Sequence, residues 1–424
     1  MQFPRWSRLL ALCVVAIPTV VSAANWPAWR GPTGDGVCTE KNLPTEWSAT
    51  KNLKWKAPLP GPGNSTPIVW GNRVFITQAI EATNRRELWC FDRKDGKVLW
   101  KQGVTHAEKE PTHATNPHCS GSPATDGERV VASFSSAGVY CYDLDGKELW
   151  HRDLGKQEHI WGYGASPVLH GDLCYLNFGP GPRSFLIAMD KRTGKTVWQH
   201  DEPGDTGFDK PDGKRGTWVG SWGDPIIRTT NGREELLLGL PGRLAAFDPK
   251  TGKDLWFCQG LNPLVYTSPI YRDGIVVAMG GFGGMALAVK AGGSGDMTSQ
   301  RLWHHPKTKQ RIGSGVISGG YIYILNDPGV AECFELATGK LVWEERLKGP
   351  GPTGQNWSSL VLAEGNLYAV NQGGDAFVFK ASPKFELVAT NPMNEKTIGS
   401  LAVSDGELFI RTHRALWCIG QPVR

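Results

Sequence analysis

Five stretches of the chain repeat one strand-turn-strand pattern that ends in tryptophan. The fullest copies are Ala188–Trp198 (AMDKRTGKTVW) and Ala246–Trp256 (AFDPKTGKDLW), while Cys90–Trp100, Cys141–Trp150 and Cys333–Trp343 keep the strands, the glycine and the tryptophan. The aspartate can accept hydrogen bonds from the turn amides, the glycine allows a positive φ, and the tryptophan presents a large flat surface. Because such a hairpin cannot bury its own tryptophan, the pattern predicts repetition, with a neighbouring unit covering each indole.

Weaker copies continue the pattern at intervals of about 40 to 50 residues. Ala288–Trp303 is a stretched copy, and Val378–Val388 has lost both the glycine and the tryptophan. A period of this length with strand-turn-strand content is typical of propellers and solenoids.

The two full copies resemble the tryptophan-docking repeat of the quinoprotein (PQQ) alcohol dehydrogenase family. The same degenerate repeat is found in BamB, the propeller lipoprotein of the Bam complex. The resemblance covers nearly the whole mature chain and implies an all-β propeller. Because the family includes both enzymes and non-catalytic scaffolds, the resemblance leaves the function open.

Each repeat also has a front half, in which a small residue or Ser-Pro precedes two apolar strands joined by a Gly turn. Eight front halves begin at Ser65, Ser122, Ser166, Ser221, Ser268, Ser314, Ser358 and Ser400. The last unit ends at residues 415–420 one strand short, and residues 52–59 form a strand with no unit before it. We expect an all-β, eight-bladed propeller of four-stranded antiparallel blades, closed by N- and C-terminal strands in one blade. Seven blades are the alternative, if residues 376–392 form a loop.

The N-terminus carries Arg5 and Arg8, then an apolar run, then a small-residue end at Ala23. This pattern predicts a signal peptide over residues 1–23, cleaved near Ala23, and a periplasmic or secreted protein. Loss of the two arginines lowers the formal charge from +5 to +3. With no basic block and no second long apolar run, the sequence favours neither a nucleic-acid partner nor a transmembrane span.

The expected mature chain has two parts. Residues 24–51, rich in Pro and Gly around WPAWRGPTGDG, are expected to form an irregular N-terminal strap across one face or the rim. Residues 52–424 are expected to form the propeller.

Eight cysteines remain after residue 23. Cys90, Cys141, Cys333 and Cys418 occupy the strand position that alanine holds in other copies, which predicts small, buried, free thiols. The other four, at positions 38, 119, 174 and 258, could pair, with a connectivity that the sequence leaves open.

The long, varied connections should all lie on one face of the ring, which makes that face the candidate binding surface. Aromatic residues precede the innermost strands there, and planar rings suit a quinone, a sugar or an aromatic side chain. The candidate ligand- or partner-binding residues are Trp161, Tyr163, Trp218, Trp222, Tyr266, Arg311, Gln355, Asn356 and Trp357. The alternative is that these rings only plug a wide channel.

Metal and cofactor chemistry is not predicted. The loop 102–121 holds three histidines and a cysteine, but their spacing matches no compact ligand pattern, so we expect a solvated loop. The resemblance implies, for a PQQ enzyme, adjacent cysteines, Ca²⁺ ligands and an Asp base. The chain has no Cys-Cys pair, and Asp224, Asn177 and Glu158 are the residues that could be proposed for the other roles.

We therefore expect a non-catalytic propeller that binds a protein partner in the cell envelope, with no catalytic residues and no cofactor. One alternative is a PQQ-dependent alcohol dehydrogenase-like oxidoreductase with Ca²⁺. The other is a glycan- or small-molecule-binding protein that uses the aromatic channel mouth.

Overall fold

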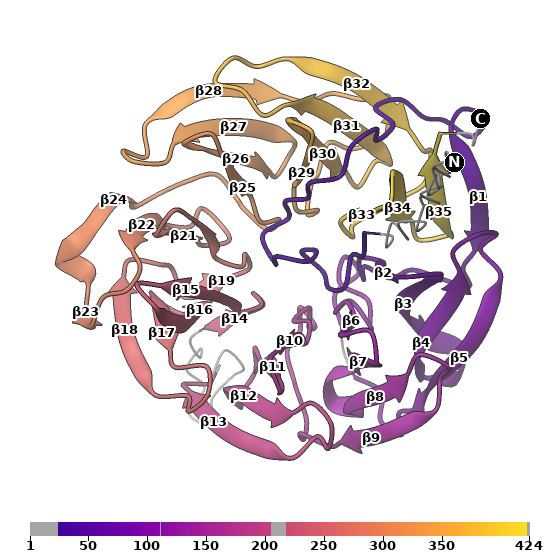
Figure 1. The fold of residues 1–424 in the computed structure, drawn as a ribbon, viewed down its shortest axis with the longest axis horizontal. Helices are drawn as coiled ribbons and strands as arrows, with labels where there is room; N and C mark the ends of the chain where they lie inside the picture. Colours follow the sequence, from indigo (N-terminus) through magenta and orange to yellow (C-terminus); the bar gives the residue numbers. More distant parts are fainter. Residues whose placement is uncertain (1–23, 111, 205–217, 422–424) are drawn as a thin grey trace, which may run out of the picture.

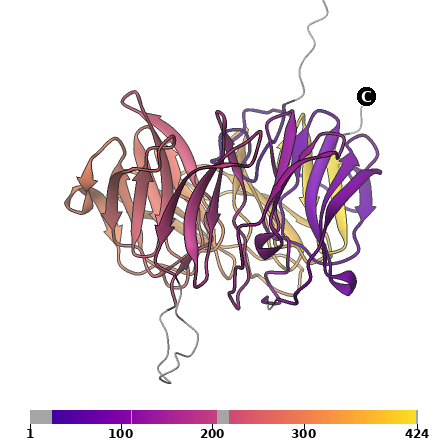
Figure 2. The ribbon, with the colours of Figure 1, turned by 90° about the horizontal axis from the view of Figure 1, so that it is seen from below.

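The computed structural model describes residues 24–110, 112–204 and 218–421, and within them eight antiparallel sheets form a ring (Figure 1). Seen edge-on, the strands of each blade run between the two faces of the ring (Figure 2). The expected signal peptide lies outside the described residues. Within these residues, no helix is long and apolar enough to cross a membrane.

Each blade has four strands, which lie side by side in order from the centre of the ring to its rim. The first four blades are, from inside to outside, blade 1, β2 (Ile68–Trp70), β3 (Arg73–Ile80), β4 (Arg85–Asp92) and β5 (Val98–Thr105); blade 2, β6 (Ala124–Thr125), β7 (Arg129–Ser133), β8 (Val139–Asp143) and β9 (Glu148–Arg152); blade 3, β10 (Val168–His170), β11 (Leu173–Phe178), β12 (Ser184–Asp190) and β13 (Thr196–Glu202); blade 4, β15 (Ile226–Thr230), β16 (Arg233–Leu240), β17 (Arg243–Phe247) and β18 (Asp254–Gln259).

The second half of the ring follows the same plan. Its blades are blade 5, β20 (Ile270–Arg272), β21 (Ile275–Met279), β22 (Ala286–Lys290) and β24 (Arg301–His305); blade 6, β25 (Val316–Ser318), β26 (Tyr321–Asn326), β27 (Val330–Glu335) and β28 (Leu341–Arg346); blade 7, β29 (Val361–Ala363), β30 (Asn366–Val370), β31 (Asp375–Lys380) and β32 (Leu387–Pro392); blade 8, β33 (Ala402–Ser404), β34 (Glu407–Arg411), β35 (Ala415–Gly420) and β1 (Leu53–Pro58).

Several short elements are present in addition to the four strands of each blade. Strand β23 (Gly295–Asp296) pairs in parallel with β18, and β14 (Gly220–Ser221) pairs in parallel with β19 (Leu264–Val265). Three 3₁₀ turns are η1 (Glu81–Thr83), η2 (Ser135–Ala137) and η3 (Thr298–Gln300). The predicted eight blades are thus confirmed, and the weakly patterned residues 376–392 form strands rather than a loop.

At most junctions, the outer-strand tryptophan of one blade packs against the turn of the next blade. A Cβ built on Gly252, which has a φ of +71°, would lie 2.5 Å from the Trp198 ring, so only glycine fits under this indole. The Trp198 Nε1–H donates to the Pro249 carbonyl at 2.9 Å. The same glycine-on-indole contact joins Gly96 to Trp55, Gly146 to Trp100, Gly194 to Trp150 and Gly339 to Trp303. Each docked indole removes roughly 200 Å² from water, on the order of 4–5 kcal/mol.

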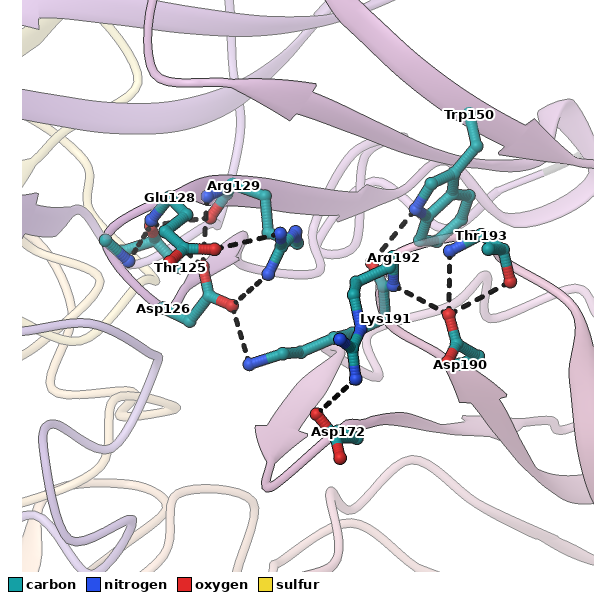
Figure 3. Close-up of polar contacts among 11 residues, drawn as sticks. Thr125, Asp126, Glu128, Arg129, Trp150, Asp172, Asp190, Lys191, Arg192 and Thr193 are labelled. Carbon is teal, nitrogen blue, oxygen red and sulfur yellow. Dashed lines mark hydrogen bonds and ion pairs between the residues drawn. The ribbon is translucent and has the colours of Figure 1, made fainter.

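Figure 3 shows one such junction, between blades 2 and 3. The Trp150 Nε1–H donates to the Lys191 carbonyl at 3.0 Å, while the Lys191 Nζ lies 2.9 Å from the Asp126 Oδ2 of blade 2. Asp190 Oδ1 accepts hydrogen bonds from the Arg192 and Thr193 amides at 3.0 and 2.9 Å, which shapes the turn. The repeated aspartate therefore holds the turn that receives the tryptophan.

The ring closes through β1, as the sequence predicts. β1 pairs antiparallel with β35, and its Trp55 donates from Nε1 to the Arg93 carbonyl of blade 1 at 2.7 Å. The N-terminal strand thus completes blade 8 and docks it on blade 1. Three junctions depart from the pattern. Trp256 donates to Glu235 of its own blade at 3.1 Å, and Trp343 donates to the Ser382 carbonyl at 2.9 Å in a turn that has no glycine. The outer strand of blade 7 has Ala389 at the register position where other blades have tryptophan.

Eight residues at the start of the innermost strands form a closed ring of hydrogen bonds. The amide of each donates to a side-chain oxygen of the corresponding residue in the next blade, at 2.6 to 3.2 Å. The members, in order, are Thr66, Ser122, Ser166, Asp224, Ser268, Ser314, Ser359 and Ser400, and Ser400 returns to Thr66. We call this set the inner ring. Asp224 is its single carboxylate.

The strap 24–51 crosses the centre of the ring on the face that carries the short turns (Figure 1). It bridges to blade 1 through Trp26 and Val69, and to blade 7 through Val37 and Leu362. Arg30, 5% exposed, donates to the carbonyls of Leu360, Gly315 and Asp35 at 2.6 to 2.7 Å. Burial lowers the pKa of Arg30 to about 10. Among the described residues, the Arg30 guanidinium donates to carbonyl oxygens alone, and those of Gly315 and Leu360 tie the strap to blades 6 and 7.

All eight cysteines of the described residues are free thiols. Those that replace the repeat alanine are buried, as predicted. Burial raises the pKa of Cys90 and of Cys141 to about 12, so both stay protonated at neutral pH.

Candidate binding site at the loop face

Aromatic side chains from three consecutive blades meet on the face opposite the strap. His159 lies among three indoles, with ring centroids 5.3 Å from Trp161, 5.5 Å from Trp218 and 5.1 Å from Trp222. Trp161 and Trp218 stack with centroids 4.9 Å apart and planes at 24°. Stacked and edge-on geometries of this kind are the favoured ones for aromatic pairs, so the rings hold one another in place.

Two further rings extend this group toward blade 5. Tyr266 lies 4.7 Å from Trp222, and Phe282 lies 5.7 Å from Tyr266 and 6.4 Å from Trp161. Phe282 is 53% exposed, the most exposed large apolar side chain of the described residues. We call His159, Trp161, Trp218, Trp222, Tyr266 and Phe282 the aromatic mouth.

The loops that carry these rings are long, and hydrogen bonds between the loops hold them in position. Trp161 precedes β10, Trp222 precedes β15, and the Trp222 Nε1–H donates to the Gly162 carbonyl at 2.9 Å across the two loops. Asn116 donates from Nδ2 to the Trp161 carbonyl at 2.7 Å. The Tyr163 hydroxyl accepts the His159 amide at 3.0 Å. The aromatic mouth is therefore a preformed surface.

A cavity of about 260 Å³ opens below the aromatic mouth, and we call it the mouth cavity. Its walls are apolar or uncharged, and its described lining contains no Asp, Glu, Lys or Arg. The side chains that line it include Trp29, Asn64, His113, Trp161, Trp222, Tyr266, Phe282, Ile312, Trp357 and Ile398. Burial raises the pKa of Tyr266 far above its usual value, and its hydroxyl has no hydrogen-bond partner in the described residues. The mouth cavity suits an apolar or aromatic group with one polar atom within reach of Tyr266.

Five of the nine predicted residues meet at this site: Trp161, Trp218, Trp222 and Tyr266 belong to the aromatic mouth, and Trp357 lines the cavity. The other four lie elsewhere. Tyr163 is 8% exposed and its hydroxyl accepts the His159 amide, and Gln355 is exposed and lies outside the cavity lining.

Arg311 and Asn356 serve the fold. Arg311 is 2% exposed, and its guanidinium donates to Glu332 at 3.1 Å and to Asn326 at 3.0 Å. Asn356 is fully buried, and its Nδ2 donates to the Leu325 carbonyl at 3.2 Å. Arg311 thus has its partners on β26 and β27, and Asn356 is bound to β26.

Sequence reasoning missed His159, Phe282 and Trp29. His159 lies two residues before Trp161 in the same loop, a spacing that could have drawn attention to it. Phe282 lies in the loop between β21 and β22, where no repeat position marks it, and Trp29 reaches the cavity from the strap. Residues on strap and loop insertions fall outside the repeat, so their position depends on the tertiary fold.

The histidine-rich loop 102–121 does not assemble ligands. In the described part of the chain, no three His, Cys, Asp or Glu side chains are grouped closely enough to hold a metal ion. His106 pairs with Glu110, with Nε2 and Oε2 3.7 Å apart, and the His113 Nδ1 lies 2.6 Å from the Thr115 hydroxyl.

The residues present do not fit a PQQ cofactor with Ca²⁺ in the mouth cavity. The quinone is a tricarboxylate, and the described lining offers no cationic side chain to neutralise it and no carboxylate to bind Ca²⁺. Asp224 belongs to the inner ring, and the Asn177 Nδ2 is used by the Ser221 and Gly223 carbonyls at 3.3 and 2.9 Å. We derive no catalytic step through this cofactor.

An eight-bladed ring held by docked tryptophans defines this protein as a propeller of the PQQ-repeat class. The chain belongs to the family described as outer membrane protein assembly factor BamB, whose sequence profile matches residues 36–207, 90–259 and 288–382.

Solved structures agree on the fold. BamB from Moraxella catarrhalis superposes with a TM-score of 0.60 at 15% identity, covering 87% of this chain and 97% of that one. A europium-containing methanol dehydrogenase superposes with a TM-score of 0.67 at 13% identity, covering 91% and 89%.

A curated relative is the polyvinylalcohol dehydrogenase of Sphingopyxis sp. (strain 113P3), 26% identical over 199 residues. That match covers 43% of this chain and 29% of the relative. The fold is therefore common to assembly factors and dehydrogenases.

Proposed function

We propose that this chain is a non-catalytic scaffold of the cell envelope that binds a protein partner through the aromatic mouth. The observation that carries the proposal is the exposed Phe282, which lies against Trp161 and Tyr266 at the edge of an uncharged cavity. Aromatic side chains dominate the energetics of protein interfaces, and the strongest contacts are central apolar anchors that fill pockets. A partner would insert one apolar or aromatic side chain into the mouth cavity, with its polypeptide crossing the rim.

The cavity size supports a side chain rather than a larger ligand. At about 260 Å³ it lies below the roughly 300–1,000 Å³ typical of small-molecule sites. The family description, outer membrane protein assembly factor, supports an envelope protein as the partner class. The apolar leader predicted at residues 1–23 supports a periplasmic or secreted location.

The test is partner retention by purified protein in an envelope extract. Phe282→Ala and Trp161→Ala should reduce retention of a specific protein at least about tenfold, because each removes part of the anchor pocket. The matched control is Leu387→Ala, which truncates a 44% exposed apolar side chain on the outer strand of blade 7. Equal retention by all variants would refute a docking role for the aromatic mouth.

The alternative function is PQQ-dependent alcohol oxidation, which the similarity to polyvinylalcohol dehydrogenase favours. Titration calorimetry with PQQ and Ca²⁺, followed by a dye-linked alcohol oxidation assay, separates the two. The scaffold proposal expects no saturable heat and no turnover. Tight PQQ binding together with alcohol oxidation, both lost in Trp161→Ala, would contradict the scaffold proposal and support the dehydrogenase function.

A further inference from the structure

A second cavity lies on the opposite face, between the strap and the inner strands of blades 2 to 5. Its volume is about 570 Å³, within the range of small-molecule sites. Strap residues 27–35 form one side, and β10, β15 and β20 with their turns form the other. We call it the strap cavity. Trp29 lines both cavities, so it stands between the strap cavity and the mouth cavity.

The strap cavity has charged walls, unlike the mouth cavity. Three arginines line it, and none of them forms an ion pair shorter than 3.8 Å among the described residues. Arg228 donates to the carbonyls of Thr33 and Ile227 at 2.7 and 2.8 Å, and its nearest carboxylate oxygen belongs to Asp35 at 3.8 Å. In the described part of the chain, the Arg272 side chain makes no hydrogen bond or ion pair with another residue. Half-buried guanidinium groups without close counter-ions favour an anionic ligand.

The acidic residues of the lining do not cancel this charge. Asp35 is occupied by the Val37 amide at 3.0 Å and by the Thr33 hydroxyl. Asp273 is exposed at its turn. Asp224, 5% exposed, accepts the Ser166 amide at 2.6 Å, and burial raises the pKa of its carboxyl to about 7. A carboxyl that can hold a proton near neutral pH can donate a hydrogen bond to a ligand carboxylate.

The lining also offers flat surfaces. Trp29 comes from the strap and Tyr271 from β20, with the Arg228 guanidinium 5.8 Å from the Tyr271 ring centroid. An aromatic face beside a guanidinium group suits a ring compound that carries an acid.

We propose that the strap cavity binds a small ring compound bearing a carboxylate, with the acid held by Arg228 and Arg272 and the ring against Trp29 and Tyr271. Two sources share this chemistry, a uronic-acid sugar and an aromatic acid. The site is independent of partner binding at the aromatic mouth.

The first experiment is calorimetric titration of the purified chain with D-glucuronate and, separately, with benzoate. Glucose serves as the ring without the acid, and acetate as the acid without the ring. At least one ring acid should bind at least about tenfold more tightly than both controls. Tight binding of glucuronate identifies a sugar acid, and tight binding of benzoate an aromatic acid. Absence of binding by both acids, or equal binding of glucose or acetate, overturns the proposal.

The second experiment assigns the binding to the cavity. Arg272→Gln should lower the affinity for the ring acid at least about tenfold, because the substitution removes a charge-assisted contact. Its matched control is Arg192→Gln, since Arg192 pairs with Asp172 on the surface turns of blade 3, outside the lining. Phe282→Ala should also leave the affinity unchanged, which separates this site from the aromatic mouth. Unchanged affinity in Arg272→Gln, with a folded variant, overturns the assignment.

The third experiment uses pH. The other titratable or charged groups that face the strap cavity are Arg30 and Asp35 of the strap, His170 of β10, Arg228 of β15, and Arg272 and Asp273 of blade 5. The affinity for the acid should rise from pH 8 to pH 6 as Asp224 takes up a proton.

Two variants assign this pH dependence to its group. Asp224→Asn keeps the oxygen that accepts the Ser166 amide and should flatten the profile, whereas His170→Gln should preserve it. A slope that survives in Asp224→Asn contradicts the role of Asp224.

Discussion

The two faces of the ring are built from the same blades, but the cavities on the two faces are lined by different kinds of side chain. On the turn face, the strap lies over the inner strands, and the strap cavity beneath it is lined by three arginines and three aspartates. On the loop face, aromatic rings surround a smaller cavity whose described lining has no Asp, Glu, Lys or Arg. Since the repeat is common to both faces, the difference comes from the insertions: the strap on one side, and the loops before β10, β15 and β20 on the other.

The comparison separates residues that hold the ring from residues that bind. The largest effect should follow removal of a docked tryptophan. Trp198→Ala should lower the free energy of unfolding by about 3–5 kcal/mol, because it leaves a cavity over Gly252 and removes one of the two hydrogen bonds that the Pro249 carbonyl accepts. Chemical denaturation measures the change. Val197→Ala, at a neighbouring side chain that is 50% exposed, should cost less than about 0.5 kcal/mol. Similar losses in both variants would contradict the docking account.

The turn glycine gives a smaller, paired test. Gly252→Ala should cost about 2–3 kcal/mol, from a positive φ and from a Cβ pressed into the Trp198 ring. Gly232→Ala has a φ of +79° with nothing within 4 Å of the added Cβ, so it should show only the backbone cost of about 1 kcal/mol. The difference in unfolding free energy between the two variants measures the docking contact. A zero difference would show that the indole moves aside freely.

The inner ring predicts a pH dependence of stability. Burial raises the pKa of Asp224 to about 7, above its unfolded value, so the folded state binds this proton more tightly than the unfolded state. The stability that Asp224 contributes is therefore present at low pH and is lost as the pH rises toward 7. Relative to wild type, Asp224→Asn should become more stable by about 2 kcal/mol between pH 5 and pH 8. Thermal unfolding across that pH range measures the difference in stability between Asp224→Asn and wild type. A difference that does not change with pH would contradict the raised pKa of Asp224.

The aromatic mouth should show the smallest effect on stability. Phe282→Ala should change the free energy of unfolding by less than about 0.5 kcal/mol, because the side chain is 53% exposed. The same variant should weaken partner binding most. A large loss of stability in thermal unfolding would make Phe282 a structural residue and remove the contrast between the two faces.

The sequence predicts the features that repeat. Strand pattern, turn glycines and tryptophans specify eight blades, and the unpaired strand around Trp55 specifies how the ring closes. The inner ring was only partly visible, because its members shift from the serines that open the strands: Thr66 takes the place of Ser65, and Asp224 follows Ser221 by three residues.

The site was predictable only where aromatic residues precede an inner strand, as with Trp161, Trp222 and Tyr266. Arg311 shows why charge alone misleads, since its guanidinium turns inward to Glu332 and Asn326. Phe282 and Trp29 could not be found, because loops and strap reach the axis through tertiary contacts that no repeat position encodes.

The most direct test of the central claim is site-specific photo-crosslinking at the aromatic mouth. A photoreactive phenylalanine analogue placed at position 282 in the native envelope should capture one defined protein partner. The same analogue at position 387, an apolar position on the outer rim that is 44% exposed, should not capture it. Capture of the same protein at both positions, or of none at position 282, would contradict a docking site at the loop face.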